Sequence, residues 1–213
     1  MRKTIGLTLI VLVYISVPIY GFSNDLSIYN INVNETEKIK LLKWVLTREN
    51  GVLTIRLKNG VRIDFVDVRS DGERARIHKF LGIDEVTNNY VIEIEHLEWK
   101  TYVQLDPYDG RTQALPGLPI YSPSNLRFFC FEPSGMDGAW IKVYQINEKS
   151  HSEIFSFGFQ DWDADNPEWI DDDTISYNAF KYKHRVKPGE KNPRIQSNIK
   201  CGKNRCEVRT PDL

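Results

Sequence analysis

The sequence predicts an all-β, antiparallel protein made of short meandering strands. The first sign is the stretch from Tyr102 to Phe131, where two apolar segments, Tyr102 to Leu105 and Leu126 to Phe131, are separated by Gly, Pro, Asn and Ser. Strands bounded by such turn residues are typical of antiparallel sheets. Two further signs are an alternating apolar pattern around Asn59-Gly60 and a closely spaced pair of cysteines near the C-terminus.

The N-terminus has the composition of a secretory signal peptide over residues 1–23. Arg2 and Lys3 provide positive charge, residues 4–19 are apolar and uncharged, and Gly21-Phe22-Ser23 supplies the small residues that signal peptidase requires. The apolar run of about 16 residues is shorter than the roughly 20 residues of a spanning helix. We therefore predict a periplasmic or secreted protein, cleaved near Ser23, without a membrane span in its mature form.

The segment that remains, residues 24–213, is about 190 residues long and suits a single β-rich domain with a sizeable core. The whole chain has a net charge of −1, so no overall field favours nucleic acid. Charge is nevertheless uneven. Glu153 to Asp173 holds eight acidic residues and no Lys or Arg, whereas Lys181 to the C-terminus holds ten basic residues. These blocks either attract separate partners or face each other and solvent.

Residues 24–50 fit either a helix or a strand. Asn34, followed by Glu35 and Glu37, has the pattern of a helix N-cap. The apolar side chains that would share one face of this helix are Ile39, Leu42, Val45 and Leu46.

A β-hairpin is predicted from Leu53 to Phe65. A two-residue Asn-Gly loop would place its apolar residues on opposite faces. A three-residue loop, with Gly60 in the left-handed region, pairs Leu57 with Val61 and collects the apolar residues on one face. We predict the three-residue loop because only it gives the hairpin a face to bury, and we expect both Leu57 and Val61 on that face.

The rest of the chain alternates short apolar segments with turn residues. Further strands are predicted at residues 90–97, 140–146, 153–159 and 174–180. Turns or loops are predicted at 71–72, 109–110, 115–119, 122–125, 134–138, 171–173 and 187–193. These spacings agree with an antiparallel meander.

The cysteines predict a disulfide hairpin at the C-terminus. Cys201 and Cys206 enclose Gly-Lys-Asn-Arg, a loop suited to a hairpin, and an oxidising compartment would keep them bonded. The alternative, a metal-binding pair, lacks further ligands nearby. Cys130 is expected to be a free, buried thiol.

A weak internal repeat relates two parts of the chain about 40 to 50 residues apart, which is the length of one propeller blade. Tyr102 to Asp106 and Pro119 to Phe128 form the first copy, and Ile141 to Ile146 and Pro167 to Tyr177 form the second.

The first copy carries a family resemblance. Its Leu-Pro-Ile-Tyr-Ser-Pro-Ser-Asn-Leu-Arg-Phe resembles the P-x-W-S-P-D-G-x-x-x-A signature of TolB-like and WD-repeat-like β-propeller blades, and Asp106 to Gly110 resembles their D-x-x-T-G turn. Tyr121 replaces Trp, Ser124-Asn125 replaces Asp-Gly, and the second copy lacks Ser-Pro. The resemblance implies a small or incomplete β-propeller; a twisted β-sandwich of blade-like meanders fits the length equally well. The order of segments also resembles uncharacterised small exported proteobacterial proteins.

The candidate binding residues form an acidic, aromatic block. They are Asp161, Trp162, Asp163, Asp165, Trp169, Asp171, Asp172 and Asp173. We expect a solvated acidic turn beside two buried tryptophans. The alternative, a calcium loop beginning at Asp161-x-Asp-x-Asp165, fails at Asn166, where such a loop needs glycine. We therefore expect no metal and no cofactor.

The sequence offers no catalytic motif on which an enzyme could be built. Ser122 lacks the glycines of a nucleophile elbow, and the four histidines are scattered. We expect a monomeric, non-enzymatic module that binds a cationic protein through the acidic block, for example an immunity or inhibitor protein against a basic envelope-targeting enzyme. The alternative is a carbohydrate-binding protein or hydrolase, with Trp162, Trp169 and Tyr121 as stacking platforms in a propeller-mouth pocket.

Overall fold

The computed structural model describes residues 34–70, 72, 74–135, 138–147, 150–159, 162–181, 194–203 and 205–209. Within them the chain forms one helix and fifteen strands. The predicted signal peptide, residues 1–23, lies outside the described residues. No helix of the described part is both long enough and apolar enough to cross a membrane.

The strands form four antiparallel sheets, each built from strands that follow one another in the chain. The first sheet contains β1 (Leu46–Glu49), β2 (Val52–Arg56) and β3 (Arg62–Val66). The second contains β4 (Ile77–Ile83), β5 (Tyr90–Glu95), β6 (Lys100–Leu105) and β7 (Thr112–Leu115). The third contains β8 (Pro119–Tyr121), β9 (Arg127–Gly135), β10 (Gly138–Asn147) and β11 (Ser150–Gly158). The fourth contains β12 (Trp162–Asp171), β13 (Thr174–Lys181), β14 (Ile195–Cys201) and β15 (Cys206–Arg209).

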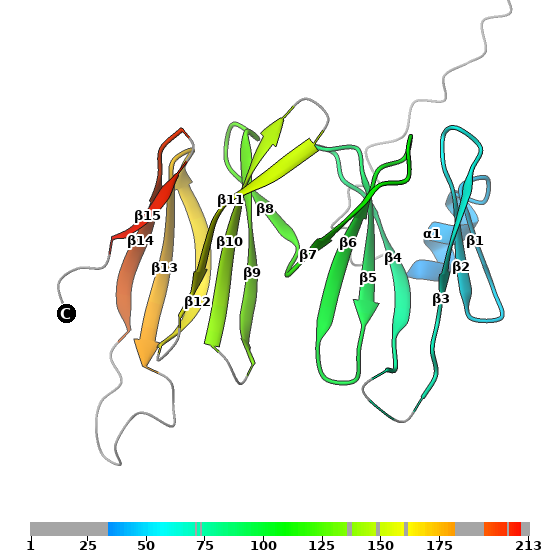
Figure 1. Cartoon of the computed structure of the whole chain (residues 1–213), viewed down its shortest axis with the longest axis horizontal. Helices are drawn as coiled ribbons and strands as arrows, with labels where there is room; N and C mark the ends of the chain where they lie inside the picture. The colour runs from blue at the N-terminus through cyan, green and yellow to red at the C-terminus, as the bar shows by residue number, and fades with distance from the viewer. Residues whose placement is uncertain are drawn as a thin grey trace, which may run out of the picture.

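The four sheets stand side by side in chain order (Figure 1). The first sheet and helix α1 (Glu35–Leu41) lie at one end of the row, and β15 lies at the other. The row stays open, and no sheet closes into a barrel. Cys201 and Cys206 pair across β14 and β15 and are joined by a disulfide, while Cys130 is free and buried. The predicted class, an all-β antiparallel meander with a C-terminal disulfide hairpin, is confirmed.

Three hydrophobic clusters hold the row together, one between each pair of neighbouring sheets. Their fully buried members include Leu53, Ile55, Phe80 and Ile92 (first and second sheets), Leu115 and Phe128 (second and third), and Phe129, Ile141, Ile175 and Ile199 (third and fourth). Strand β9 shows how one sheet serves two clusters. Phe128 and Phe129 belong to different clusters because successive side chains of a strand point to opposite faces. Each core is therefore shared between neighbours, as in repeat proteins.

The described part of residues 24–50 contains both of the structures considered, because helix α1 is followed by strand β1. Asn34 is its N-cap, and the side-chain oxygen of Asn34 accepts the backbone N–H of Glu37 at 3.0 Å. Leu42 and Leu46, which follow the helix, are buried in the first cluster, and Ile39 and Val45 pack against it. The capping residue is confirmed, whereas the predicted helical face is wrong beyond Ile39, because α1 ends at Leu41 and Leu42, Val45 and Leu46 follow it.

The hairpin of β2 and β3 has the predicted three-residue loop. Leu53 lies opposite Phe65, and Ile55 lies opposite Ile63. The N–H of Leu57 donates to the carbonyl of Val61 at 2.7 Å. The expected burial of Val61 is wrong, because its side chain is 53% exposed. Val61 lies between the three-residue loop and the start of β3, so the packing of the strands does not cover it.

Replacing Gly60 with Val is expected to lower the free energy of unfolding by roughly 1 to 2 kcal/mol. Gly60 has a φ of +87°, and nothing lies within 4 Å of a Cβ added there, so the cost comes from backbone strain alone. Urea unfolding of this variant and of Gly72→Ala, whose Cβ would also meet open space, measures the difference. If both variants unfolded at the same urea concentration, the backbone strain expected for Val at residue 60 would be contradicted.

The expected acidic turn at Asp161 to Trp169 is wrong, because this segment is mostly strand β12. Asp163 lies opposite Phe180, and Asp165 lies opposite Asn178 on β13. The register shifts after Asp165, where Asn166 has a φ of 50°, so the turn-forming Asn-Pro pair makes a bulge. Ala164 is buried in the third cluster and Trp169 packs against it. Burial on that face outweighs the turn propensity of Asp and Asn, and only the turn at Asp172 and Asp173 is confirmed.

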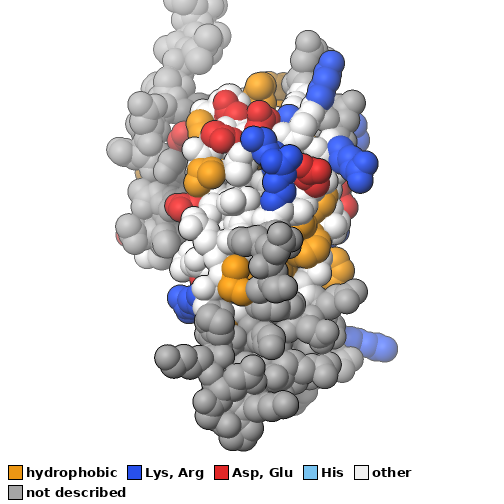
Figure 2. Space-filling model, turned by 90° about the vertical axis from the view of Figure 1, so that its left-hand side faces the viewer, with side chains coloured by type: hydrophobic (Ala, Val, Ile, Leu, Met, Phe, Trp, Pro, Cys, Tyr) orange, Lys and Arg blue, Asp and Glu red, His pale blue; other side chains and the backbone are white. Residues whose placement is uncertain are grey.

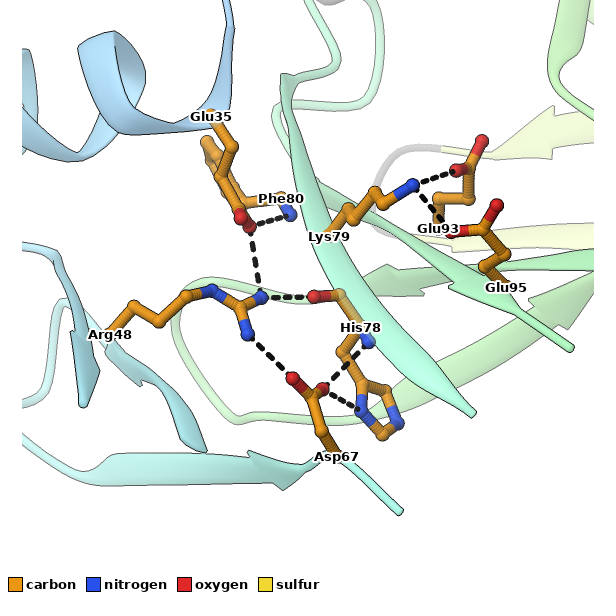
Figure 3. Close-up of polar contacts among 8 residues, drawn as sticks. All are labelled: Glu35, Arg48, Asp67, His78, Lys79, Phe80, Glu93 and Glu95. Carbon is orange, nitrogen blue, oxygen red and sulfur yellow. Dashed lines mark hydrogen bonds and ion pairs between the residues drawn. The ribbon is translucent and has the colours of Figure 1, made fainter. Parts of the chain in front are cut away.

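A network of charged side chains joins α1 to the first and second sheets (Figure 3). Arg48 donates to Asp67 at 2.9 Å, to Glu35 at 3.0 Å and to the backbone carbonyl of His78. Asp67 also accepts the backbone N–H of His78 at 2.9 Å, and its side chain is 4% exposed. A buried carboxylate needs such partners, so the network fixes how helix and sheets meet.

Candidate functional site

The structure describes six of the eight predicted site side chains, all on β12 and the turn after it. Asp161 lies outside the described residues, and of Trp162 only the backbone is described. Asp163, Asp165 and Trp169 are half-buried, whereas Asp171, Asp172 and Asp173 are exposed. The name acidic turn is used below for these last three residues.

The half-buried aspartates are engaged within the chain. Asp165 accepts a hydrogen bond from the Asn178 amide at 3.0 Å and forms an ion pair with Arg194 at 2.7 Å. Asp163 accepts the backbone N–H of Ala164 at 2.8 Å. Because Arg194 belongs to the basic C-terminal block, at least part of the acidic block faces the basic block.

The acidic turn is held in place by the neighbouring sheet. Asp172 accepts the backbone N–H of Ser124 at 2.6 Å, and Asp173 accepts from Arg127 at 2.5 Å. The backbone of Asp173 lowers the pKa of Asp171, and the hydroxyl of Ser124 lowers the pKa of Asp172, because hydrogen bonds stabilise the ionised form. The carboxylates of Asp171 and Asp172 therefore stay charged at neutral and mildly acidic pH.

The face at the β15 end of the row carries charges of both signs. Figure 2 shows acidic and basic side chains interspersed near one edge of this face, with hydrophobic side chains next to them. Glu207 and Arg209 of β15 form one such pair, at 2.5 Å. The described side chains that Figure 2 shows on this face therefore do not form a surface of a single charge.

A groove between the second and third sheets was not among the predicted sites. Its volume is about 980 Å³, and it is lined by the β5–β6 turn, the link from β7 to β8, and β9. The lining is mainly apolar and includes Trp99, Tyr102, Pro116, Gly117, Pro119, Ile120, Tyr121, Phe131 and Pro133. We call it the aromatic groove. Most of it comes from the stretch Tyr102 to Phe131, whose strands and turns first predicted the fold.

Gly117 is required for the wall of the aromatic groove. A Cβ added at this residue would lie 2.4 Å from the carbonyl oxygen of Phe131 and 3.1 Å from its carbonyl carbon. The link from β7 to β8 therefore packs directly on the backbone of β9. Any side chain at residue 117 would push the link away and change the shape of the groove.

Two aromatic rings of the groove are held in defined positions. The Trp99 indole is 46% exposed and stacks on His96, with ring centroids 4.8 Å apart and an interplanar angle of 16°. The Tyr121 hydroxyl donates to the carboxylate of Asp84, which is fully buried and also accepts the Gln104 amide at 3.0 Å. The rings thus present fixed apolar surfaces to the groove.

Two exposed carboxylates, Glu98 and Glu132, also line the aromatic groove. Neither forms an ion pair with another residue of the described part of the chain. Lys100 lines the groove as well, but its ammonium donates to Glu93 at 3.1 Å. Within the described part of the chain, two carboxylates without an ion pair therefore line the same groove as the exposed indole of Trp99.

The stacking platforms predicted from the sequence fall in different places. Tyr121 lines the aromatic groove. Trp169 is half-buried against Phe129, and its indole N–H donates to the carbonyl of Ile120 at 2.8 Å, so it anchors β12 to β8. Ile120 lines the groove and Ser124 holds the acidic turn, so β8 and the turn after it contact both features. Trp99 lies in the turn between β5 and β6 and is exposed. A tryptophan at a turn between two strands is the sequence signal that could have identified it as a candidate site residue.

His78, which is buried, and His151, which is half-buried, have structural surroundings. Burial lowers the pKa of His151 to about 4, and its ring packs edge-on against Phe128 and Tyr144. Burial is also the main reason why the pKa of His78 is lowered, although Asp67 opposes the shift. Both histidines are therefore neutral at pH 7.

Within the described ranges, no group of three His, Cys, Asp or Glu side chains is placed to hold a metal ion.

The chain matches no protein-family model, and it matches no curated protein.

Proposed function

We propose that this protein is a non-enzymatic module, exported after removal of residues 1–23, that binds another protein carrying positive charge. One observation carries the proposal. The short segment of β8 and the turn after it contributes to a preformed aromatic groove through Ile120 and holds a fixed acidic turn through Ser124, so the same segment supports apolar contact surface and negative charge. Interfaces combine these elements, because aromatic pockets supply binding energy and charges supply specificity and fast association.

The partner that suits this surface is a basic protein. The ionised carboxylates of Asp171 and Asp172 are exposed, and Glu98 and Glu132 add negative charge at the groove. A basic enzyme that attacks the cell envelope is one such protein, and the module would then act as its immunity or inhibitor protein. Rigid support of the surface from two packed sheets lowers the ordering cost of binding.

A second candidate function is carbohydrate binding in the same groove. The observation that favours it is that the exposed indole of Trp99 lines the same groove as two carboxylates, those of Glu98 and Glu132. A sugar ring would stack on the indole and donate hydroxyl hydrogen bonds to the carboxylates. The mainly apolar lining gives few further partners for hydroxyl groups, so protein binding remains the first proposal.

Replacing both Asp171 and Asp172 with Asn is expected to slow association with the partner several-fold and to flatten its salt dependence. Asn keeps the side-chain oxygens that accept from Asp173 and Ser124, so the turn retains its acceptors while it loses two charges. Partners are first captured from envelope extract on the immobilised protein. Association rates are then measured at two salt concentrations, beside a thermal melt.

The matched control is Glu49→Gln with Glu85→Gln, which removes two exposed charges elsewhere. The proposal predicts a slower rate for the aspartate variant only, with unchanged melts for both. It would be refuted if no protein were retained, or if both double variants associated at the same rate. A lowered melt with intact binding would make the acidic turn a structural feature only.

A further inference from the structure

We propose that the aromatic groove binds an extended, proline-containing peptide segment with a basic side chain, whose charged group lies over Trp99 between Glu98 and Glu132. The inference rests on the proposed function in one respect, that the ligand is a protein. It adds the binding site on this chain and the chemistry of the bound segment.

The apolar part of the groove suits a polyproline II segment. Such segments dock into grooves lined by aromatic rings, because their conformation is already formed before binding and little entropy is lost. Here the walls present Tyr102, Tyr121 and Phe131, with prolines at the link and at β9. The volume of about 980 Å³ is large enough for several residues of an extended chain.

The charges of the groove select a cation. Glu98 and Glu132 are negatively charged and form no ion pair with another described residue, and the faces of an indole attract cations as well. Lys100 does not cancel them, because Glu93 holds its ammonium. A Lys or Arg side chain of the ligand would therefore find three favourable groups, Trp99, Glu98 and Glu132, in the lining of the groove.

The receiving groups are positioned in advance. The stack of His96 under Trp99 is supported by the Nε2 atom of His96, which lies 3.3 Å from the Thr101 hydroxyl. The Tyr121 hydroxyl is bound to the buried Asp84, and this bond fixes the ring that lines the groove. A preformed site of this kind favours a ligand that is itself stiff.

The probe is a set of ten labelled decapeptides of Ala and Pro with the repeat APP, which differ in the position of a single Arg. Binding to the whole protein is followed by fluorescence anisotropy. We expect saturable binding for at least one peptide. Replacing its Arg with Glu, or its prolines with Gly, should weaken binding about tenfold or more.

The groove variants are Trp99→Ala and the pair Glu98→Gln with Glu132→Gln. Each should weaken binding of that peptide about tenfold. The controls are Trp140→Ala, an exposed tryptophan that does not line the groove, and Glu85→Gln. Both controls should bind as the original protein does. The altered side chains of all four are exposed, so we expect every variant to fold, and a thermal melt verifies this.

The inference is overturned if no peptide binds saturably, or if the groove variants bind as the controls do. It is also overturned if chitohexaose binds in a Trp99-dependent manner while the peptides do not, since the groove is then a sugar site. A failure of the proposed function gives a result that differs from a failure of the groove site. Peptides that bind in the groove while no envelope protein is captured would refute that function and leave the groove site standing.

Discussion

Replacing Arg48 with Met is expected to lower the free energy of unfolding by about 3 kcal/mol. Arg48 is the hydrogen-bond donor that joins Glu35 of α1, Asp67 after β3 and the backbone of His78 in β4 (Figure 3). Met preserves much of the apolar volume of the side chain but removes the charge. The carboxylate of Asp67, 4% exposed, then lacks its main cationic partner. Urea unfolding at pH 7 measures the loss.

Arg56→Met is the matched control, because Arg56 is an exposed arginine of the adjacent strand β2. It should change stability by no more than about 0.5 kcal/mol. Adding Asp67→Leu to Arg48→Met should restore part of the loss, because the buried carboxylate is then absent as well. If Arg48→Met and Arg56→Met unfold at the same urea concentration, the network does not stabilise the junction between the first two sheets.

Replacing Gly117 with Ala is expected to lower the free energy of unfolding by about 2 kcal/mol or more. The added Cβ would lie 2.4 Å from the carbonyl oxygen of Phe131, and this atom belongs to a strand with partners on both sides. The backbone must therefore move, whereas a flexible side chain could have turned aside. The link from β7 to β8 should shift away from β9, so the variant should also lose peptide binding in the aromatic groove.

Gly72→Ala is the control for this variant, since its Cβ would have nothing within 4 Å. Urea unfolding and the anisotropy assay are applied to both proteins. A Gly117→Ala variant that is as stable as Gly72→Ala and still binds the peptide would show that the link is not pressed against β9.

The sequence indicated one part of the candidate site, the acidic turn, and missed the other, the aromatic groove. The aspartates of the acidic turn are adjacent in sequence, and their composition alone singled them out. The aromatic groove was missed because Trp99, Gly117 and Phe131 come from a hairpin turn, a link and a strand of two different sheets. No periodicity or motif connects residues that only the packing of sheets brings together.

What the sequence determined by itself is local. Asn34 ahead of two glutamates produces a capped helix, the three-residue loop at Gly60 sets the register of β2 with β3, and a four-residue loop lets Cys201 meet Cys206. In each case the deciding interactions lie within a few residues, so the pattern contains them. The tertiary structure alone decided that the segment at Asp163 and Asp165 extends as β12 and that Val61 stays exposed. These outcomes depend on which sheet covers which face, and that free energy comes from partners distant in the sequence.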